Sequence, residues 1–301
     1  DVPRYHSDVR YFEILDGDTP IAGFYLDLYA REGKRGGAWM DECRVRRTRE
    51  DGSLQLPVAY LTCNFTRPVG GKPALLTHDE VLTLFHEFGH GLHHMLTRQT
   101  VADVSGINGV AWDAVELPSQ FMENFCWERE GLDMIAAHVD TGEKLPDALL
   151  NKLQAARNFQ SAMGMMRQLE LSLFDFRLHH ESQAPSADEV QALLDDVRDK
   201  TSVTPRVDFN RFQNGFGHIF AGGYAAGYYS YKWAEVLSAD AYSAFEEAGI
   251  FDTATGQRFR QEILERGGSR DAAALFEAFR GRAPSIEPLL RHSGIESAEA
   301  A

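Results

Sequence analysis

The sequence has few cysteines, a shortage of positive charge and no long apolar run, and each shortage excludes a class of protein. Its 301 residues include three cysteines, Cys43, Cys63 and Cys126, too few and too scattered for a disulfide framework. They favour a reducing compartment, so the expected location is cytoplasmic. With 30 Lys and Arg against 45 Asp and Glu, the formal net charge is −15, which argues against a nucleic-acid partner. No stretch approaches the roughly 18 consecutive apolar residues of a membrane span, so no membrane partner is expected.

What is present fits a soluble globular protein. Hydrophobic residues make up 44% of the chain and charged residues 25%, enough apolar surface for a substantial core. The chain begins at Asp1, without Met and without a signal-peptide pattern, which suggests the later part of a longer protein.

The hydrophobic patterns predict a mainly α fold with a small antiparallel β-sheet near the N-terminus. Strands are expected at residues 9–15, 21–30, 38–46 and 57–65. Thr77 and Glu80 have the spacing of a capping box, so a helix should begin there and run to about Thr97. Further helices are expected at 114–139, 146–180, 187–199, 224–248, 256–266 and 270–280.

No internal boundary between independent domains is visible. We interpret residues 1–70 as a sheet subregion and residues 71–295 as one helical region of the same unit. The segment 181–186 reads as a linker between helices because it contains Pro185. Residues 296–301 read as a frayed tail.

The most informative motif is His86-Glu87-Phe88-Gly89-His90, which has the form His-Glu-x-x-His. Four residues turn a helix by about 400°, so both imidazoles leave one face and can hold one metal ion, with Glu87 beside them as a general base. This arrangement is typical of zinc peptidases. Gly89 and Gly91 each cost a helix about 1 kcal/mol relative to alanine. They suggest close approach by another backbone, although ordinary helix packing would also explain them.

A third metal ligand has two candidates. His93 lies on nearly the same face, but three imidazoles in a row along about 10 Å of helix match tetrahedral coordination poorly. Glu116 is the better candidate, and Glu123, seven residues later, would share its helix face and could accept the free N–H of a ligand histidine. Pro118 lies between them and is best tolerated in a first helical turn. Without the motif at 86–90, the two glutamates would be read as a solvated helix face.

The segment from Gly215 to Tyr231 is rich in glycine and tyrosine. Its spacing does not fit the G-x-G-x-x-G pattern, so a dinucleotide site is rejected. Tyr224, Tyr228 and Tyr231 would present three phenols on one helix face, where they could donate hydrogen bonds to an oxyanion. An aromatic packing stripe explains the same spacing. His218 is likewise open to a structural or a catalytic role.

Taken together, these motifs resemble the thimet oligopeptidase family of zinc metallopeptidases. The resemblance extends from about Tyr11 to Ile295. The segments that carry it are 36–40, 59–65, 85–94, 116–120 and 218–231. It implies a helical, zincin-like fold split by a deep narrow channel that admits short unfolded peptides, with the small sheet beside the metal helix.

The resemblance also implies roles for individual residues. His86, His90 and Glu116 would bind one zinc ion per chain, and Glu87 would activate the attacking water. Glu123 would orient a ligand histidine. The residues that would contact the substrate or stabilise the tetrahedral intermediate are His218, Tyr228 and Tyr231, with Tyr224 as a further substrate contact.

The implied activity is endo-acting hydrolysis of peptide bonds in short peptides. A dipeptidyl carboxypeptidase of the same family is the alternative activity, although the sequence of residues 112–118 is more similar to the endo-acting branch. A metal-stabilised fragment that binds peptides without cutting them is an alternative of another class. Family members are about twice as long, so the N-terminal helical part that forms much of the opposite channel wall is expected to be missing or supplied as a partner.

Overall fold

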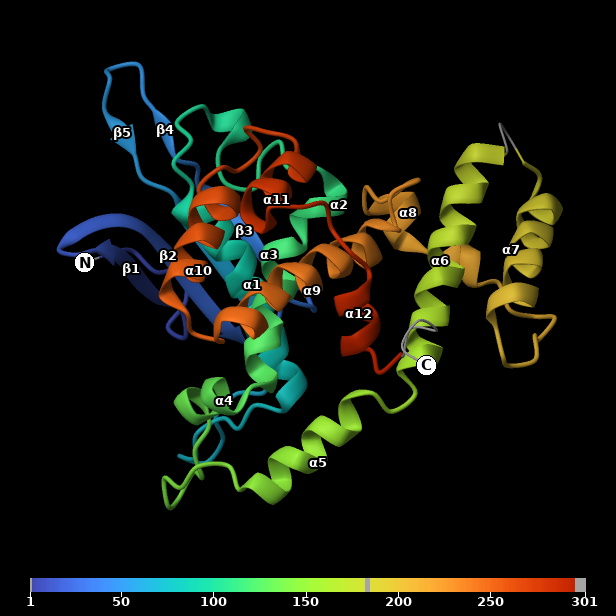
Figure 1. Cartoon of the computed structure of the whole chain (residues 1–301), viewed down its shortest axis with the longest axis horizontal. Helices are drawn as coiled ribbons and strands as arrows, with labels where there is room; N and C mark the ends of the chain where they lie inside the picture. The colour runs from blue at the N-terminus through green and yellow to red at the C-terminus, as the bar shows by residue number, and fades with distance from the viewer. Residues whose placement is uncertain (1, 182–184, 296–301) are drawn as a thin grey trace.

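The computed structural model describes residues 2–181 and 185–295 and is mainly helical, with a small sheet near the N-terminus (Figure 1). The strands are β1 (Arg10–Asp16), β2 (Thr19–Tyr29), β3 (Trp39–Arg44), β4 (Arg47–Thr48), β5 (Leu54–Gln55) and β6 (Val58–Phe65). The helices are α1 (His78–Leu96), α2 (Trp112–Val115), α3 (Leu117–Glu123), α4 (Arg129–Ile135), α5 (Asp147–Arg157), α6 (Ser161–Glu181), α7 (Ala187–Thr201), α8 (Gly217–Ala221), α9 (Ser230–Ala248), α10 (Thr253–Phe259), α11 (Ala272–Arg280) and α12 (Glu287–His292).

The main sheet contains the four expected strands in the order β1-β2-β6-β3. The expectation of an antiparallel sheet is wrong for its central pair, because β6 runs parallel to β2 while the two outer pairs are antiparallel. Burial explains the arrangement: β6 is apolar and buried at most positions, so it takes an inner place between β2 and β3. The short pair β4 and β5, inserted between β3 and β6, has no counterpart in the expectation.

Helix α1 packs across the sheet and is the element that carries the metal motif. Its predicted start is confirmed: Thr77 is the N-cap, and Thr77 and Glu80 form a capping box. Phe88 and Met95 on α1 pack against side chains of the strands, including Leu61 of β6. This packing fixes the position of the helix against the sheet.

Several expected helices are shorter than predicted. The segment 114–139 is divided among α2, α3 and α4, and the segment 146–180 is divided between α5 and α6, with Gln160 at a positive φ of 56°. Helix α9 begins at Ser230 rather than at Tyr224, because Ala226 has a φ of 55°, outside the right-handed helical region. The short helices α8 and α12 were not expected.

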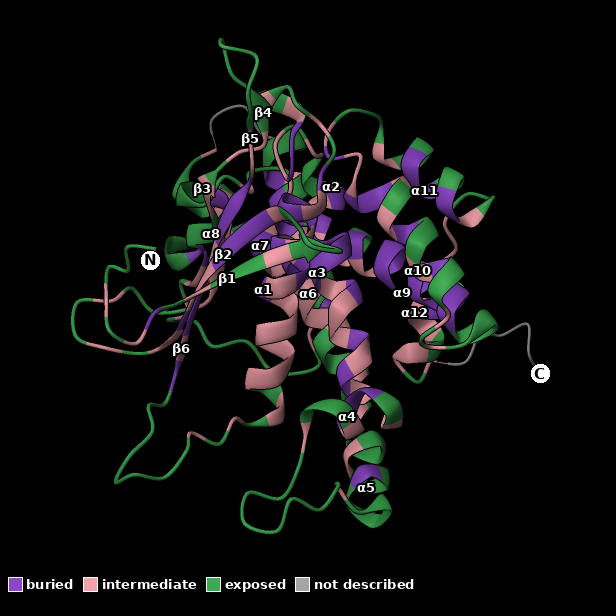
Figure 2. Cartoon of the chain, turned by 90° about the vertical axis from the view of Figure 1, so that its left-hand side faces the viewer, coloured by how far each residue is buried: buried purple, intermediate pink, exposed green. Residues whose placement is uncertain are grey.

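Two further cores lie away from the sheet. One surrounds α9, which packs on α3, α10 and α11 through side chains such as Phe121 and Tyr242. The other joins the hairpin of α6 and α7 to the segment that includes Phe216 and Tyr228. In Figure 1 this hairpin lies at the opposite end of the molecule from the sheet, and in Figure 2 the buried residues gather on β2, β6, α3 and α9.

Two sequence-based expectations lie partly or wholly beyond this description. Residues 182–184 of the predicted linker and the predicted tail at 296–301 fall outside the described residues. Among the residues that are described, no helix combines the length and apolar character needed to span a membrane.

Candidate metal centre

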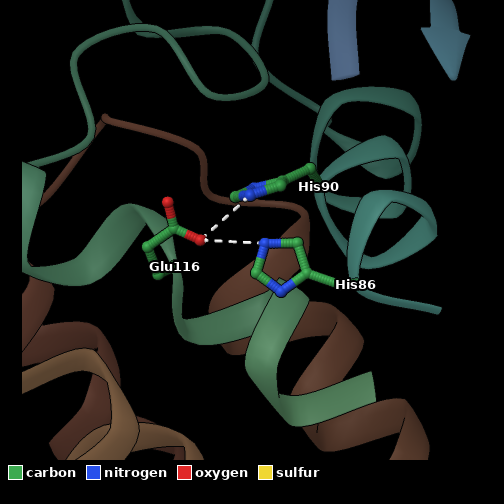
Figure 3. Close-up of side chains that lie close together, drawn as sticks. All are labelled: His86, His90 and Glu116. Atoms are coloured by element: carbon green, nitrogen blue, oxygen red, sulfur yellow. Dashed lines mark ion pairs between the residues drawn. The ribbon is translucent and has the colours of Figure 1, made fainter. Parts of the chain in front are cut away.

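Three of the predicted residues converge where α1 meets the junction of α2 and α3. His86 and His90 leave one face of α1, and Glu116 occupies the residue between α2 and α3. Oε2 of Glu116 lies 3.2 Å from Nε2 of His86 and 3.1 Å from Nε2 of His90 (Figure 3). One donor atom from each residue falls within 4.8 Å of the other two. The arrangement can therefore surround a single metal ion.

Small residues let the two segments come this close. A Cβ placed on Gly89 would lie 2.6 Å from Cα of Ser119, so only glycine fits there. The expectation of close backbone approach is thus confirmed for Gly89, whereas Gly91 faces the side chain of Leu61 at 3.0 Å. Pro118 lies in the first turn of α3, where proline is tolerated.

The carboxylate of Glu116 is held from its own side of the site. The buried hydroxyl of Ser119 donates within 2.9 Å of both the main-chain carbonyl and Oε2 of Glu116. Ser119 lies within a motif that carried the family resemblance, but its role as a support for Glu116 was not foreseen. Only the fold shows that its hydroxyl turns back toward residue 116.

His86 is clamped between two carboxylates. Its Nδ1 lies 2.7 Å from Oε1 of Glu123, while its Nε2 faces Glu116. If Nδ1 donates to Glu123, Nε2 is left as the free electron-pair donor. Burial alone lowers the pKa of His86, but the two glutamates outweigh it and raise the pKa to about 10. For Glu116, burial raises the pKa, but the hydrogen bonds from His86 and His90 outweigh it and hold the pKa well below its usual range.

Glu87 lies on α1 between the two histidines in sequence and is 6% exposed. Burial raises its pKa, and this effect exceeds the lowering by the charges of His86 and His90 and by a hydrogen bond from the backbone of Met40. Met40 belongs to β3, at the edge of the sheet. The structure therefore places a carboxyl group with a raised pKa between the candidate metal ligands and β3, the last strand in the sheet order.

His93 lies outside this cluster. It is 3% exposed, and neither ring nitrogen has a hydrogen-bond partner among the described residues. Burial lowers its pKa to about 3. The next residue, His94, is also buried, and its Nε2 lies 2.8 Å from the carbonyl oxygen of Arg44. Both histidines thus pack into the interior.

The four aromatic residues predicted near the substrate do gather, although not on one helix face. His218 lies on α8, Tyr224 and Tyr228 in the following turn, and Tyr231 on α9. The ring centroids of Tyr224 and Tyr231 are 5.0 Å apart, and that of His218 lies between 5.6 and 6.4 Å from the three tyrosines.

This aromatic cluster lies beside the metal-ligand cluster. Burial raises the pKa of Tyr224 and of Tyr231, and the charge of Glu116 raises both further. The side-chain amide of Gln120 on α3 donates to the carbonyl oxygen of Tyr231 at 3.2 Å. Trp112 on α2 packs against Tyr224 with the ring centroids 4.8 Å apart, a contact that no sequence motif indicates.

Comparison with known proteins identifies relatives of this chain. Residues 1–295 match peptidase family M3. The chain is 60% identical over 295 residues to oligopeptidase A of Haemophilus influenzae, covering 98% of this chain and 43% of that protein. It is 60% identical over 297 residues to oligopeptidase A of Escherichia coli, covering 98% of this chain and 44% of that protein. It therefore spans less than half the length of either relative.

More distant likenesses extend the comparison. A dipeptidyl carboxypeptidase of Salmonella typhimurium is 42% identical over 302 residues, covering 98% of this chain and 43% of that protein. Among solved structures, a carboxypeptidase of Pyrococcus furiosus superposes with a TM-score of 0.59 at 17% identity, over 90% of this chain and 53% of that chain. PZ peptidase A, solved with an inhibitor, superposes with a TM-score of 0.57 at 17% identity, over 89% of this chain and 42% of that chain. These two structures support the fold.

Proposed function

The chain belongs to peptidase family M3, and from this premise we propose that it is the catalytic region of a zinc-dependent endo-oligopeptidase that hydrolyses peptide bonds in short unfolded peptides. The observation that supports this most strongly is the convergence of His86, His90 and Glu116, with Glu123 on the far nitrogen of His86. We assign residues 1–301 to one catalytic region, with residues 1–70 as the sheet subregion, residues 71–295 as the helical zinc-site region and residues 296–301 as a tail, and we propose a cytoplasmic location.

The donor set fits zinc. Two imidazoles and one carboxylate are a common set of protein ligands in catalytic zinc sites, which leave a further position open. Zinc held by His86, His90 and Glu116 would supply a Lewis acid that polarises the scissile carbonyl and acidifies a water molecule. Glu123 keeps His86 in the tautomer and ring orientation that this binding requires.

Glu87 is the proposed general base and acid. Its carboxylate takes a proton from the water whose oxygen bonds to the scissile carbonyl carbon, and it later delivers that proton to the amine as the C–N bond breaks. Both transfers need a carboxyl group with a pKa closer to neutrality than that of an exposed glutamate. The raised pKa of buried Glu87 supports this role.

The aromatic cluster is the proposed site of oxyanion stabilisation. Burial raises the pKa of Tyr228 and of Tyr231, so both phenols stay protonated at neutral pH and remain hydrogen-bond donors. With His218 they would face the oxygen on which negative charge develops. Tyr224 would contact the substrate, and its ring packs against that of Trp112.

The free edge of β3 is the proposed track for the substrate backbone. This strand ends the sheet order and lies beside Glu87, so an extended peptide could add to it as a further strand. N-methylation of the peptide amides that would pair with β3 should raise KM. Unchanged binding would contradict this part of the proposal.

We propose that the rest of the channel is formed by the part of the relatives' sequences that lies outside the region matched by this chain. The two oligopeptidase A relatives are more than twice as long as the matched region. An apolar groove beside α1 is lined by residues such as Phe85, Phe125 and Met134, and the side chain of Met134 is 70% exposed. We propose that this groove contacts the N-terminal half of the enzyme.

A dipeptidyl carboxypeptidase activity is the second candidate, because the chain is 42% identical to such an enzyme. The two activities differ in their products. We expect the zinc-loaded chain to cut a ten-residue peptide, blocked at its C-terminus, at internal bonds, with the products identified by mass spectrometry. Stepwise loss of dipeptides from an unblocked C-terminus, with no cleavage of the blocked peptide, would favour the carboxypeptidase.

A non-catalytic peptide-binding fragment would behave differently again. Chelation would lower its melting temperature, but no peptide would be cut after any metal is restored. We expect instead that chelation abolishes hydrolysis of the blocked peptide and that zinc restores it.

A further inference from the structure

The turn that carries Tyr224 and Tyr228 is held by a buried carboxylate from another part of the chain. Asp175 lies on α6 and is 1% exposed. Its Oδ1 accepts the backbone N–H of Ala226 and its Oδ2 accepts that of Tyr228, both at 2.9 Å. Nδ1 of His179, one turn further along α6, lies 3.0 Å from Oδ1. The motifs in the sequence give no sign of this contact, because residue 175 is some 50 positions away from the turn.

One of the two amides bound by Asp175 belongs to a strained residue, Ala226, and the other belongs to Tyr228, two residues later. Ala226 has a φ of 55°, a left-handed conformation that side chains with a Cβ disfavour. Two neighbouring amides bond within the segment: Tyr224 donates to the carbonyl oxygen of His218, and Gly227 donates to that of Tyr224. The contacts from Asp175 thus supply an external constraint where the local preference of the chain opposes the observed turn.

The geometry of the turn decides where the aromatic side chains point. Tyr228 is 7% exposed and packs beside Phe216, with its ring 5.6 Å from His218 and 5.4 Å from Tyr231. If Ala226 relaxed to a right-handed conformation, the chain direction entering Tyr228 would change and this cluster would come apart.

We propose that Asp175 is a positioning residue: it clamps the turn at Ala226 and so holds Tyr224 and Tyr228 beside the metal centre. The kinetic consequence rests on the proposed function, whereas the clamp itself does not. A carboxylate suits this task because its two oxygens accept both N–H groups at once, and its burial excludes water that would compete for them.

The test compares Asp175→Asn with the parent chain by amide hydrogen exchange and by kinetics. We expect the amides of residues 224–229 to exchange about tenfold faster in the variant, because one acceptor oxygen becomes an NH2 group. In the zinc-loaded enzyme we expect kcat to fall by about 10- to 100-fold with KM within about threefold, since misplaced catalytic groups act mainly on turnover. Hydrogen exchange needs no activity, so failure of the clamp and failure of the proposed function are distinguishable.

Two substitutions at Ala226, which is exposed, keep the test decisive if Asp175→Asn folds poorly. Ala226→Val should loosen the same turn with Asp175 intact, because a β-branched residue resists a positive φ. Ala226→Gly should restore part of the lost kcat to Asp175→Asn, since glycine adopts this conformation freely.

Asp240→Asn is the matched control. Asp240 on α9 is also fully buried and accepts a backbone N–H, that of Ser285 at 2.8 Å, but it pairs with Arg280 at the end of α11 and with Arg282. The Asp240→Asn variant should be less stable than the parent, but the amides of residues 224–229 should not exchange selectively faster. Unchanged exchange there in both Asp175→Asn and Ala226→Val, or a rise spread equally over all helices, would overturn the proposal. A change in the KM of Asp175→Asn with no change in kcat would also overturn the proposal.

Discussion

His86 has a carboxylate at each ring nitrogen, and these contacts tie the proposed metal centre to α3. Glu116 and Glu123 contact opposite sides of the ring, 3.2 and 2.7 Å away. The spacing of seven residues predicted that both glutamates could reach a histidine. It did not show that Glu116 lies just before α3 and Glu123 at its end.

Removing the charge of Glu123 should weaken metal binding without abolishing it. Loss of a carboxylate that orients a ligand histidine costs roughly 10- to 100-fold in metal affinity. We expect Glu123→Gln to show a drop of that size in competition titrations of zinc against a chelating dye, with one zinc per chain at saturation. Glu130→Gln, a change of the same kind at an exposed position of α4, is the control. Equal affinities in all three proteins would contradict the proposed role of Glu123.

His93 provides a contrast at the next turn of α1. Its ring is buried with both nitrogens lacking partners among the described residues, an unfavourable state for polar atoms. We expect His93→Leu to bind one zinc per chain with the affinity of the parent. Loss of zinc from this variant would favour His93, instead of Glu116, as the third metal ligand.

His93 should also make the stability of the zinc-free chain depend on pH. Its pKa of about 3 in the folded chain lies below the ordinary value of about 6.5, so between these pH values the unfolded chain binds more protons. The contribution of His93 to the free energy of unfolding therefore falls as the pH drops below about 6.5, while His86, whose pKa is raised, contributes in the opposite direction. Urea unfolding at pH 7 and pH 5 should show a smaller loss in His93→Leu than in the parent, and an equal loss would contradict the assignment.

At the scale of elements, close contact between α1 and α3 brings the ligands together. The glycine at position 89 lies against the backbone of Ser119, and a methyl group has no room there. We expect Gly89→Ala to destabilise the chain by about 1–2 kcal/mol, because overpacking outweighs the gain in helix propensity. Zinc affinity should fall as α3 is displaced.

Gly164→Ala in α6 is the matched control for this change. A Cβ at Gly164 would meet no atom within 4 Å, so only the helix propensity changes, and stability should rise by up to about 1 kcal/mol. Urea unfolding of both variants measures the difference. A stabilised Gly89→Ala that binds zinc as the parent does would show that the close approach is not needed.

The elements that the sequence predicted well are those fixed by local chemistry. The capping box at Thr77 and the four strand segments of the main sheet depend mainly on neighbours along the chain, and both are confirmed. The parallel pairing of β2 and β6 depends on burial of the whole sheet, which the sequence does not show strand by strand. The spacing of the tyrosines predicts a helix from Tyr224, whereas the structure has a turn at Ala226 that is bound by the distant Asp175.

For the whole molecule, the apolar groove beside α1 should control association. Its rim includes Met134, 70% exposed, and Phe251, 49% exposed. Exposed apolar patches of this kind promote contact with other chains. We expect the 301-residue chain to self-associate in sedimentation experiments, and Met134→Lys to shift it toward monomer.

Met163→Lys on α6 is the control for this effect, since Met163 is 46% exposed but belongs to another surface. Both variants should keep the parent's zinc content. Equal association of the parent and both variants would show that the groove beside α1 is not the contact surface.

The central claim is that Glu87 performs proton transfer at a metal centre formed by His86, His90 and Glu116. The most direct measurement compares hydrolysis of a short internally quenched fluorescent peptide by the parent and by Glu87→Gln, both carrying one zinc per chain. We predict cleavage by the parent and a loss of at least about 100-fold in kcat in the variant, within the range that general acid–base catalysis supplies. Equal cleavage by both proteins at the same zinc content would contradict the account.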